Sequence, residues 1–139
     1  MENDFLDFGK TILAQQPFSA LLGAQITVFK AGQAELIIPI RPELKQQHGF
    51  VHGGVISYAA DNALTFAGGS ALGSEVVTSE FKINYLRPAK GENLVARASV
   101  NYAGKSQAVC RCDVFMVKDG EEVLCATAQG TITRLGQPG

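Results

Sequence analysis

Hydrophobic side chains recur at helical spacing in the first part of the chain. Residues 4–16 follow this spacing and stop before Pro17, which predicts a short amphipathic helix. A further helical turn is expected over 18–22, closed by Gly23. Residues 1–22 are therefore expected to form an N-terminal helical segment.

The next section of the chain combines two strands with one long helix. Residues 24–29 and 33–40, joined by a short turn that contains glycine, predict a pair of strands. Residues 41–52 contain proline and glycine and are expected to form a loop. Residues 53–72 lack proline and are rich in alanine, which predicts a helix that ends near Gly73.

From residue 77 onward, hydrophobic and polar residues alternate with a period of two, which is typical of strands. We expect four long strands, over 77–85, 94–102, 108–116 and 123–134. In the first of them, uninterrupted alternation would place Ser79 on one face with the hydrophobic residues. Tight turns favour antiparallel neighbours, so the pattern predicts an α+β domain with one helix packed on one antiparallel sheet. No linker, repeat or low-complexity tract divides residues 1–139, which are expected to form a single domain.

Composition and charge exclude several classes of protein. A hydrophobic content of 46% excludes an intrinsically disordered chain. The net charge of −1, without a basic stripe, argues against a nucleic-acid partner. Charged residues make up 18% of the chain, below a typical share of about 25%. Some of the surface is therefore expected to be covered by another subunit.

The termini and the cysteines bear on where the protein works. The acidic N-terminus differs from a signal peptide, and no stretch offers the roughly 20 apolar residues of a membrane span. Cys110, Cys112 and Cys125 lie in strand-like sequence without metal-ligand spacing, so we expect small buried hydrophobic residues and no metal site. Cys110 and Cys112 are two residues apart and would share one face of a strand. We expect a reduced, cytoplasmic protein without a membrane partner.

The predicted helix over 53–72 is apolar on nearly every side, which predicts that it is buried all round. Its polar residues Ser57, Asp61 and Thr65 follow one another at intervals of four and share one face. A buried carboxylate must be hydrogen-bonded, neutralised or used in chemistry. Two interpretations of Asp61 follow, a carboxylate held by Ser57 and Thr65 for packing alone, or a functional group.

The start of this helix favours the functional interpretation. His52 precedes Gly53 and Gly54, and the first N–H groups of a helix have no acceptor within it. Glycines without a Cβ atom let a ligand approach the backbone closely. The positive end of the helix would then suit a carbonyl oxygen that develops negative charge.

Two segments resemble a known family. Residues 46–67, QQHGFVHGGVISYAADNALTFA, resemble the HGG-x6-D pattern of hotdog-fold acyl-CoA thioesterases of the phenylacetate-degradation type. Residues 78–92, TSEFKINYLRPAKGE, are similar to a strand-and-turn segment of that family, and the resemblance covers roughly residues 18–134. It implies a hotdog fold, in which a curved antiparallel sheet of about five to six strands wraps one long central helix. It also implies a homodimer or homotetramer with active sites at the subunit interface.

The resemblance assigns roles residue by residue. Asp61 matches a carboxylate that acts as general base or nucleophile, two roles that spacing cannot separate. Gly53 matches the residue whose N–H polarises the thioester carbonyl. Gln46 matches an Asn or Gln that holds the attacking water or the carbonyl. His52 matches a histidine that supports the loop and the thioester end, with a purely structural histidine as the alternative.

Other residues are expected to bind substrate. Gly54 would allow close approach to the helix start, and Thr65 and Ser79 match hydroxyl positions near the carboxylate in different relatives. Coenzyme A also needs partners for its phosphates. The candidates for that role lie in two turns: Arg87, Lys90, Lys105 and Ser106. His48 has no counterpart in the pattern and is expected to be a loop residue.

These observations favour hydrolysis of an aryl- or medium-chain acyl-CoA to the free acid and CoA, with no metal and no cofactor other than the CoA of the substrate. Gly53 and Asp61 are eight residues apart, about 12 Å along one helix. They cannot both touch one carbonyl, so a two-fold axis would have to bring together Asp61 and the helix start of two subunits. A non-catalytic acyl-CoA binding protein is the alternative. A hotdog hydratase would need a differently placed His–acid pair.

Overall fold

A computed structural model describes residues 2–136, with side chains from residue 4. Residues 1 and 137–139 of the predicted domain lie outside the described residues. The helices are α1 (Glu2–Ala14), α2 (Pro17–Leu22), a short 3-10 turn η1 (Pro42–Leu44) and α3 (Gly53–Leu72). The strands are β1 (Gln25–Lys30), β2 (Gln33–Pro39), β3 (Val76–Tyr85), β4 (Asn93–Ala103), β5 (Gln107–Lys118) and β6 (Glu121–Arg134).

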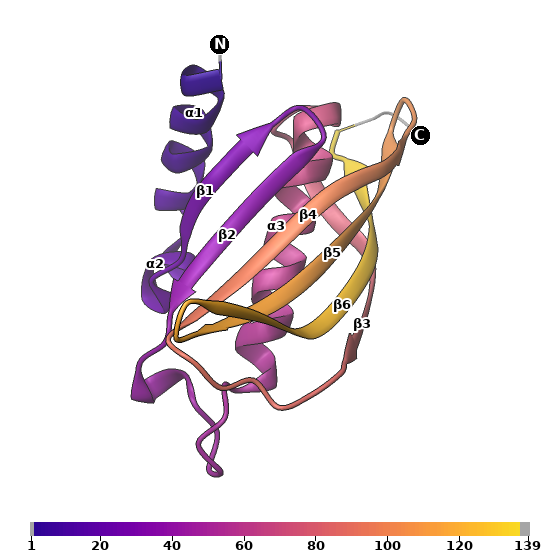
Figure 1. Ribbon diagram of the computed structural model, residues 1–139. Helices are drawn as coiled ribbons and strands as arrows, with labels where there is room; N and C mark the ends of the chain where they lie inside the picture. The colour runs from indigo at the N-terminus through magenta and orange to yellow at the C-terminus, as the bar shows by residue number, and fades with distance from the viewer. Residues whose placement is uncertain (1, 137–139) are drawn as a thin grey trace.

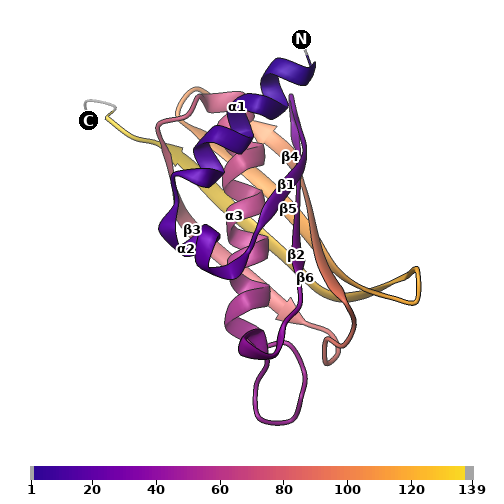
Figure 2. The ribbon, with the colours of Figure 1, turned by 90° about the vertical axis from the view of Figure 1, so that its left-hand side faces the viewer.

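The six strands form one sheet in the order β1-β2-β4-β5-β6-β3, and every neighbouring pair is antiparallel. The sheet wraps α3, which runs between β1 and β2 on one side and β3 on the other (Figures 1 and 2). The predicted α+β hotdog architecture, with one long central helix in a curved sheet, is therefore confirmed. The N-terminal segment α1 and α2 lies on the side of α3 that faces the viewer in Figure 2.

The helix α3 lies close to β6 because glycine occupies their contact. A Cβ atom added at Gly68 would lie 2.7 Å from Cβ of Ile132. A larger residue would force apart the helix and the sheet. The predicted bounds of α3 are confirmed, with His52 as N-cap and Gly73 directly after the last turn.

The prediction that α3 is buried all round is wrong. Its apolar residues, among them Ala60 and Leu64, are fully buried against the sheet. A line of polar residues along another side remains only half-buried: Ser57, Tyr58, Asp61, Asn62 and Thr65. The sheet of one chain covers only part of the helix circumference, so the polar residues collect where the sheet does not reach.

The prediction of uninterrupted alternation in β3 is also wrong, because the strand contains a β-bulge. The register of β3 with β6 shifts between Thr78 and Glu80, so Ser79 is an extra residue without a partner. A bulge reverses the alternation of faces, so the residues before it and those after it point inward at positions of opposite parity. Before the bulge, Thr78 points to α3 together with Val76, whereas Ser79 is exposed.

The cysteines pack as small hydrophobic residues, as predicted. Cys110, Cys112 and Cys125 are buried and unpaired. Burial raises the pKa of the Cys110 and Cys125 thiols to about 11. Among the described residues, no cluster of three His, Cys, Asp or Glu side chains forms a metal site. Within residues 2–136, every helix is too short or too polar to cross a bilayer.

Candidate functional site

The start of α3 presents one free backbone donor. His52 Nδ1 accepts a hydrogen bond from the Gly54 N–H at 2.8 Å, which caps the helix. The carbonyl of His52 accepts from Val55 N and Ile56 N. No described residue accepts a hydrogen bond from the Gly53 N–H. The Gly53 N–H is therefore the donor left for a ligand at the positive end of α3.

Gly54 contacts the His52 side chain, and its predicted role in letting a ligand approach the helix start stays a prediction. Its N–H is occupied by His52, and a Cβ atom at this position would lie 3.0 Å from His52 Nδ1. Gly54 thus gives the imidazole room to fold back over the helix end. Since Nδ1 accepts a hydrogen bond, the neutral ring carries its proton on Nε2.

Tyr85, which sequence reasoning missed, lies beside the free donor. Its Oη donates to the Gly53 carbonyl at 3.2 Å. Its ring would lie 3.7 Å from a Cβ atom added at Gly53. The last residue of β3 therefore fixes the first turn of α3. Its place at the end of a hydrophobic alternation made it look like an ordinary strand residue.

Gln46 organises the loop that leads to α3. Its Oε1 accepts from His48 N at 2.6 Å and from Phe50 N at 3.2 Å. Its backbone N–H donates to the Phe50 carbonyl at 2.8 Å. His48 contributes only its backbone N–H to this turn and is exposed, as expected for a loop residue. Val51 N then donates to Ala89 O at 2.9 Å, which fixes this loop against the segment after β3.

Asp61 is anchored by a residue of β3. Thr78 Oγ1 donates to Asp61 Oδ1 at 2.7 Å and lies 2.9 Å from Thr65 Oγ1. Each hydroxyl has one proton, so Thr65 shares its own between Thr78 Oγ1 and the Asp61 backbone carbonyl at 2.8 Å. Among the described residues, none donates to Oδ2 of Asp61. Thr78 thus fixes Oδ1 of Asp61, and Oδ2 is left without a donor among the described residues.

Of the two interpretations of Asp61, the one in which Ser57 and Thr65 hold its carboxylate is therefore wrong, because Thr78 is the donor. Thr65 bonds back to the carbonyl one helical turn earlier, a common choice for threonine within a helix. The Ser79 hydroxyl makes no contact with the carboxylate of its own chain. Its Oγ lies 2.7 Å from Thr133 Oγ1 and donates to Thr131 O at 3.2 Å, on the exposed side of β3.

The predicted CoA-binding residues lie at two ends of the molecule. Arg87 and Lys90 are exposed in the segment after β3, near the start of α3. Lys105 and Ser106 lie in the turn between β4 and β5, at the other end of the sheet (Figure 1). Ser106 O accepts from Arg134 N at 2.8 Å, close to the C-terminal end of α3. The length of β4, roughly 35 Å, separates the two groups in one chain.

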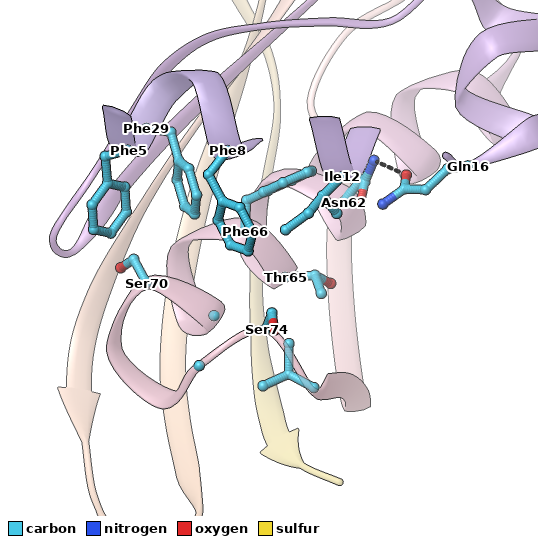
Figure 3. Close-up of a pocket in the computed structure, with 13 residues that line it drawn as sticks. Phe5, Phe8, Ile12, Gln16, Phe29, Asn62, Thr65, Phe66, Ser70 and Ser74 are labelled. Carbon is cyan, nitrogen blue, oxygen red and sulfur yellow. Dashed lines mark hydrogen bonds between the residues drawn. The ribbon is translucent and has the colours of Figure 1, made fainter. Parts of the chain in front are cut away.

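A groove lies between α1 and α3, beside the anchored carboxylate. It has a volume of about 320 Å³ and includes Thr65, the partner of Thr78. Figure 3 shows four phenylalanine rings gathered in one part of this groove and the Gln16–Asn62 hydrogen bond at another. Sequence reasoning missed the groove because its walls come from α1, β1, α3 and the start of β3, most of which are distant in the sequence.

Gln16 and Asn62 belong to a polar cluster behind this groove. Asn62 Nδ2 donates to Gln16 Oε1 at 3.0 Å and to Tyr58 Oη at 3.0 Å. Tyr58 Oη donates to Ser19, which is almost fully buried. Burial raises the pKa of the Tyr58 phenol, which stays neutral. The cluster ties α2 to α3 and closes the N-terminal side of the groove.

Comparisons with known proteins identify the family. The model of the thioesterase superfamily matches residues 48–123, which contain the start of α3 and Asp61. The chain belongs to the thioesterase superfamily. The resemblance found in the sequence is thereby confirmed, and the chemistry of the chain is thioester hydrolysis.

Individual relatives within this superfamily cover nearly the whole chain. A thioesterase family protein of Silicibacter pomeroyi is 39% identical with a TM-score of 0.86, over 90% of this chain and 93% of that one. The phenylacetic acid degradation protein PaaI of Thermus thermophilus, solved as a mutant, is 28% identical with a TM-score of 0.75, over 86% of this chain and all of that one. The medium/long-chain acyl-CoA thioesterase YigI of Escherichia coli K12 is 26% identical over 88% of both chains.

Proposed function

We propose that the chain hydrolyses an aryl- or medium-chain acyl-CoA to the free acid and CoA. The observation that supports this most directly is the Asp61 carboxylate, fixed through Oδ1 by Thr78 and free at Oδ2. The names of two relatives point to the same substrate class, since YigI is a medium/long-chain acyl-CoA thioesterase and PaaI belongs to phenylacetic acid degradation.

The proposed site combines residues of two copies of the chain. Gly53 and Asp61 belong to one helix, about 12 Å apart by its rise, so one thioester carbonyl cannot reach both. The sheet has a strand available for pairing, because β3 has a neighbour on one side only. Two β3 edges related by a two-fold axis would bring Asp61 of one copy toward Gly53 of the other.

In the proposed reaction, the Gly53 N–H binds the thioester oxygen and Asp61 acts on the carbonyl carbon. As a general base, Asp61 takes a proton from water while the water oxygen attacks the carbon. The resulting oxyanion is stabilised by the Gly53 N–H and the helix end. Its collapse breaks the C–S bond, and the CoA thiolate takes a proton. The step requires no metal and no cofactor beyond the CoA of the substrate.

As a nucleophile, Asp61 would instead form an acyl anhydride and release CoA, and water would then cleave the anhydride. Only the nucleophilic route can place solvent oxygen in Asp61, whereas cleavage of the anhydride at its acyl carbon labels the product acid as direct attack does. A single turnover in H₂¹⁸O labels the product acid if water attacks the thioester directly. It labels Asp61 if water cleaves the anhydride at the aspartyl carbon.

The remaining predicted residues support this chemistry in the proposal. Gln46 keeps its Nε2 donor for water or substrate while its Oε1 holds the loop. His52 supports the helix start through Gly54. Arg87 and Lys90 lie near Gly53 and are the cations that one chain offers to the CoA phosphates there. Lys105 and Ser106 would reach the same CoA only from another subunit.

Release of free thiol from a panel of acyl-CoA substrates tests the proposed function. Hydrolysis of aryl- or medium-chain acyl-CoA that Asp61→Asn abolishes is the expected result. The alternative, a non-catalytic acyl-CoA binding protein, predicts binding of the same panel by calorimetry without thiol release. That result would refute the proposed function.

A further inference from the structure

The groove between α1 and α3, called the α1–α3 groove below, runs parallel to the helix. Its α3 lining begins at Asn62, continues through Gly69 and ends at Gly73, just past the last turn. These positions lie on one face of the helix over three turns, about 16 Å at the rise of an α-helix. The groove is therefore an elongated channel and not a round pocket.

The groove begins beside the reacting group. Thr65 lines it, and its Oγ1 lies 2.9 Å from Thr78 Oγ1, which donates to Asp61 Oδ1. An occupant that extends from the thioester carbon at Asp61 thus enters the groove at Thr65.

One wall of the groove is made of aromatic rings, and the polar residues of the lining carry no charge: Gln16, Asn62, Thr65, Ser70 and Ser74. Phe29 packs edge to face against Phe5 and Phe66, with ring centroids 4.7 and 5.3 Å apart. Phe8 of α1 adds a more exposed ring to the same wall (Figure 3). The lining contains no charged side chain among the described residues. Such walls favour a hydrocarbon occupant.

We propose that the α1–α3 groove holds the acyl chain of the substrate as a linear chain, and that Gly69 and Phe8 determine which lengths are accepted. This inference rests on the proposed function. An extended hydrocarbon with C–C bonds of about 1.5 Å advances roughly 1.3 Å per carbon. The rise from Asp61 to Gly69 is about 12 Å, so roughly nine carbons reach Gly69. A phenylacetyl group ends well before it.

Gly69 keeps the far part of the groove open. A Cβ atom at this position would lie 3.5 Å from Val76 Cγ2, an ordinary contact, so the backbone tolerates a side chain here. A leucine must extend further, into the space between α3 and α1. Ala71→Leu is the matched control, since Ala71 is exposed on the same helix and does not line the groove.

The kcat/KM for butanoyl-, decanoyl- and phenylacetyl-CoA tests this inference. Gly69→Leu is expected to lower kcat/KM for decanoyl-CoA by about 10- to 100-fold, because the leucine side chain occupies the space of the last carbons. The values for butanoyl- and phenylacetyl-CoA are expected to stay within about 3-fold, because these groups end before Gly69. Ala71→Leu is expected to leave all three unchanged.

Phe8 offers a second test on the opposite wall. Phe8→Ala is expected to lower kcat/KM for decanoyl-CoA several-fold and to spare butanoyl-CoA, because only the longer chain lies along α1. Phe18→Ala is its control, since Phe18 is as exposed as Phe8 (56% against 54%) and lies outside the groove. An equal effect of Phe8→Ala and Phe18→Ala on the decanoyl-to-butanoyl ratio would contradict a role for α1.

The experiment gives different results if the groove assignment is wrong and if the proposed function is wrong. If thiol is released but Gly69→Leu leaves the decanoyl-to-butanoyl ratio as in the wild type, the groove assignment is overturned and thioester hydrolysis stands. If no substrate is hydrolysed, calorimetry with decanoyl- and butanoyl-CoA still tests the groove. A loss of affinity in Gly69→Leu for decanoyl-CoA alone supports it, and an equal affinity of the wild type and Gly69→Leu for decanoyl-CoA refutes it.

Discussion

Thr78→Val removes the hydroxyl that fixes Asp61 and preserves the shape of the side chain. The strand keeps a β-branched residue, so β3 is expected to fold as before. The variant deletes the 2.7 Å hydrogen bond to Asp61 Oδ1 and the 2.9 Å contact with Thr65 Oγ1. Thr78 is a positioning residue in this account, because it acts on substrate only through the carboxylate.

The magnitude follows from the charge of the acceptor. A hydrogen bond to a charged group contributes about 1.5–3 kcal/mol. If the whole contribution serves to orient the carboxylate in the transition state, kcat falls roughly 10- to 100-fold, since about 1.4 kcal/mol corresponds to a factor of ten. The KM is expected to change little, because the acyl and CoA contacts remain.

Steady-state thiol release by Thr78→Val, Thr78→Ser and Ser79→Ala checks this prediction. Thr78→Ser restores the hydroxyl and is expected to recover most of kcat. Ser79→Ala is a matched control one residue away, because Ser79 bonds to Thr131 and Thr133 on the exposed side of β3. A wild-type kcat for Thr78→Val, or a larger loss for Ser79→Ala, would refute the assigned geometry.

Two further predictions concern the phosphates and the thiols. Arg87→Ala and Lys90→Ala are expected to raise KM several-fold with little change in kcat. The rise in KM is expected to be smaller at high salt. Unchanged KM values in both variants would show that other cations bind CoA. The thiols of Cys110 and Cys125 have pKa values of about 11 in the folded chain, against 9.0 for a free thiol. They therefore ionise at a higher pH in the folded chain than in the unfolded chain. The unfolded state then binds fewer protons, so the free energy of unfolding is expected to fall as pH rises from about 9 to 11, and urea titrations that show no such fall would contradict this.

The sequence predicted the elements of this fold well, because each follows from local pattern and punctuation. The glycines and His52 at the start of α3, together with the absence of proline up to Gly73, predict its bounds. Period-two alternation predicts the strands, and the HGG-to-Asp spacing predicts the family that the comparisons confirm.

What the sequence could not predict depends on register and on distant contacts. The bulge at Ser79 arises from how β3 pairs with β6, and it gives Thr78, not Ser79, to Asp61. The separation of Lys105 from Arg87 follows from the direction of β4, although the two residues lie close in the sequence. The α1–α3 groove needs the docking of α1, which no local pattern encodes.

The most direct test of the account is the kcat of Asp61→Asn, measured with its melting temperature on the best substrate of the acyl-CoA panel. Asparagine is nearly isosteric, and its Oδ1 still accepts from Thr78, so the variant is expected to remain folded. It lacks the basic or nucleophilic carboxylate. The account predicts a loss of about 10²- to 10⁴-fold in kcat. A folded Asp61→Asn variant with the kcat of the wild type would contradict the claim that Asp61 performs the chemistry.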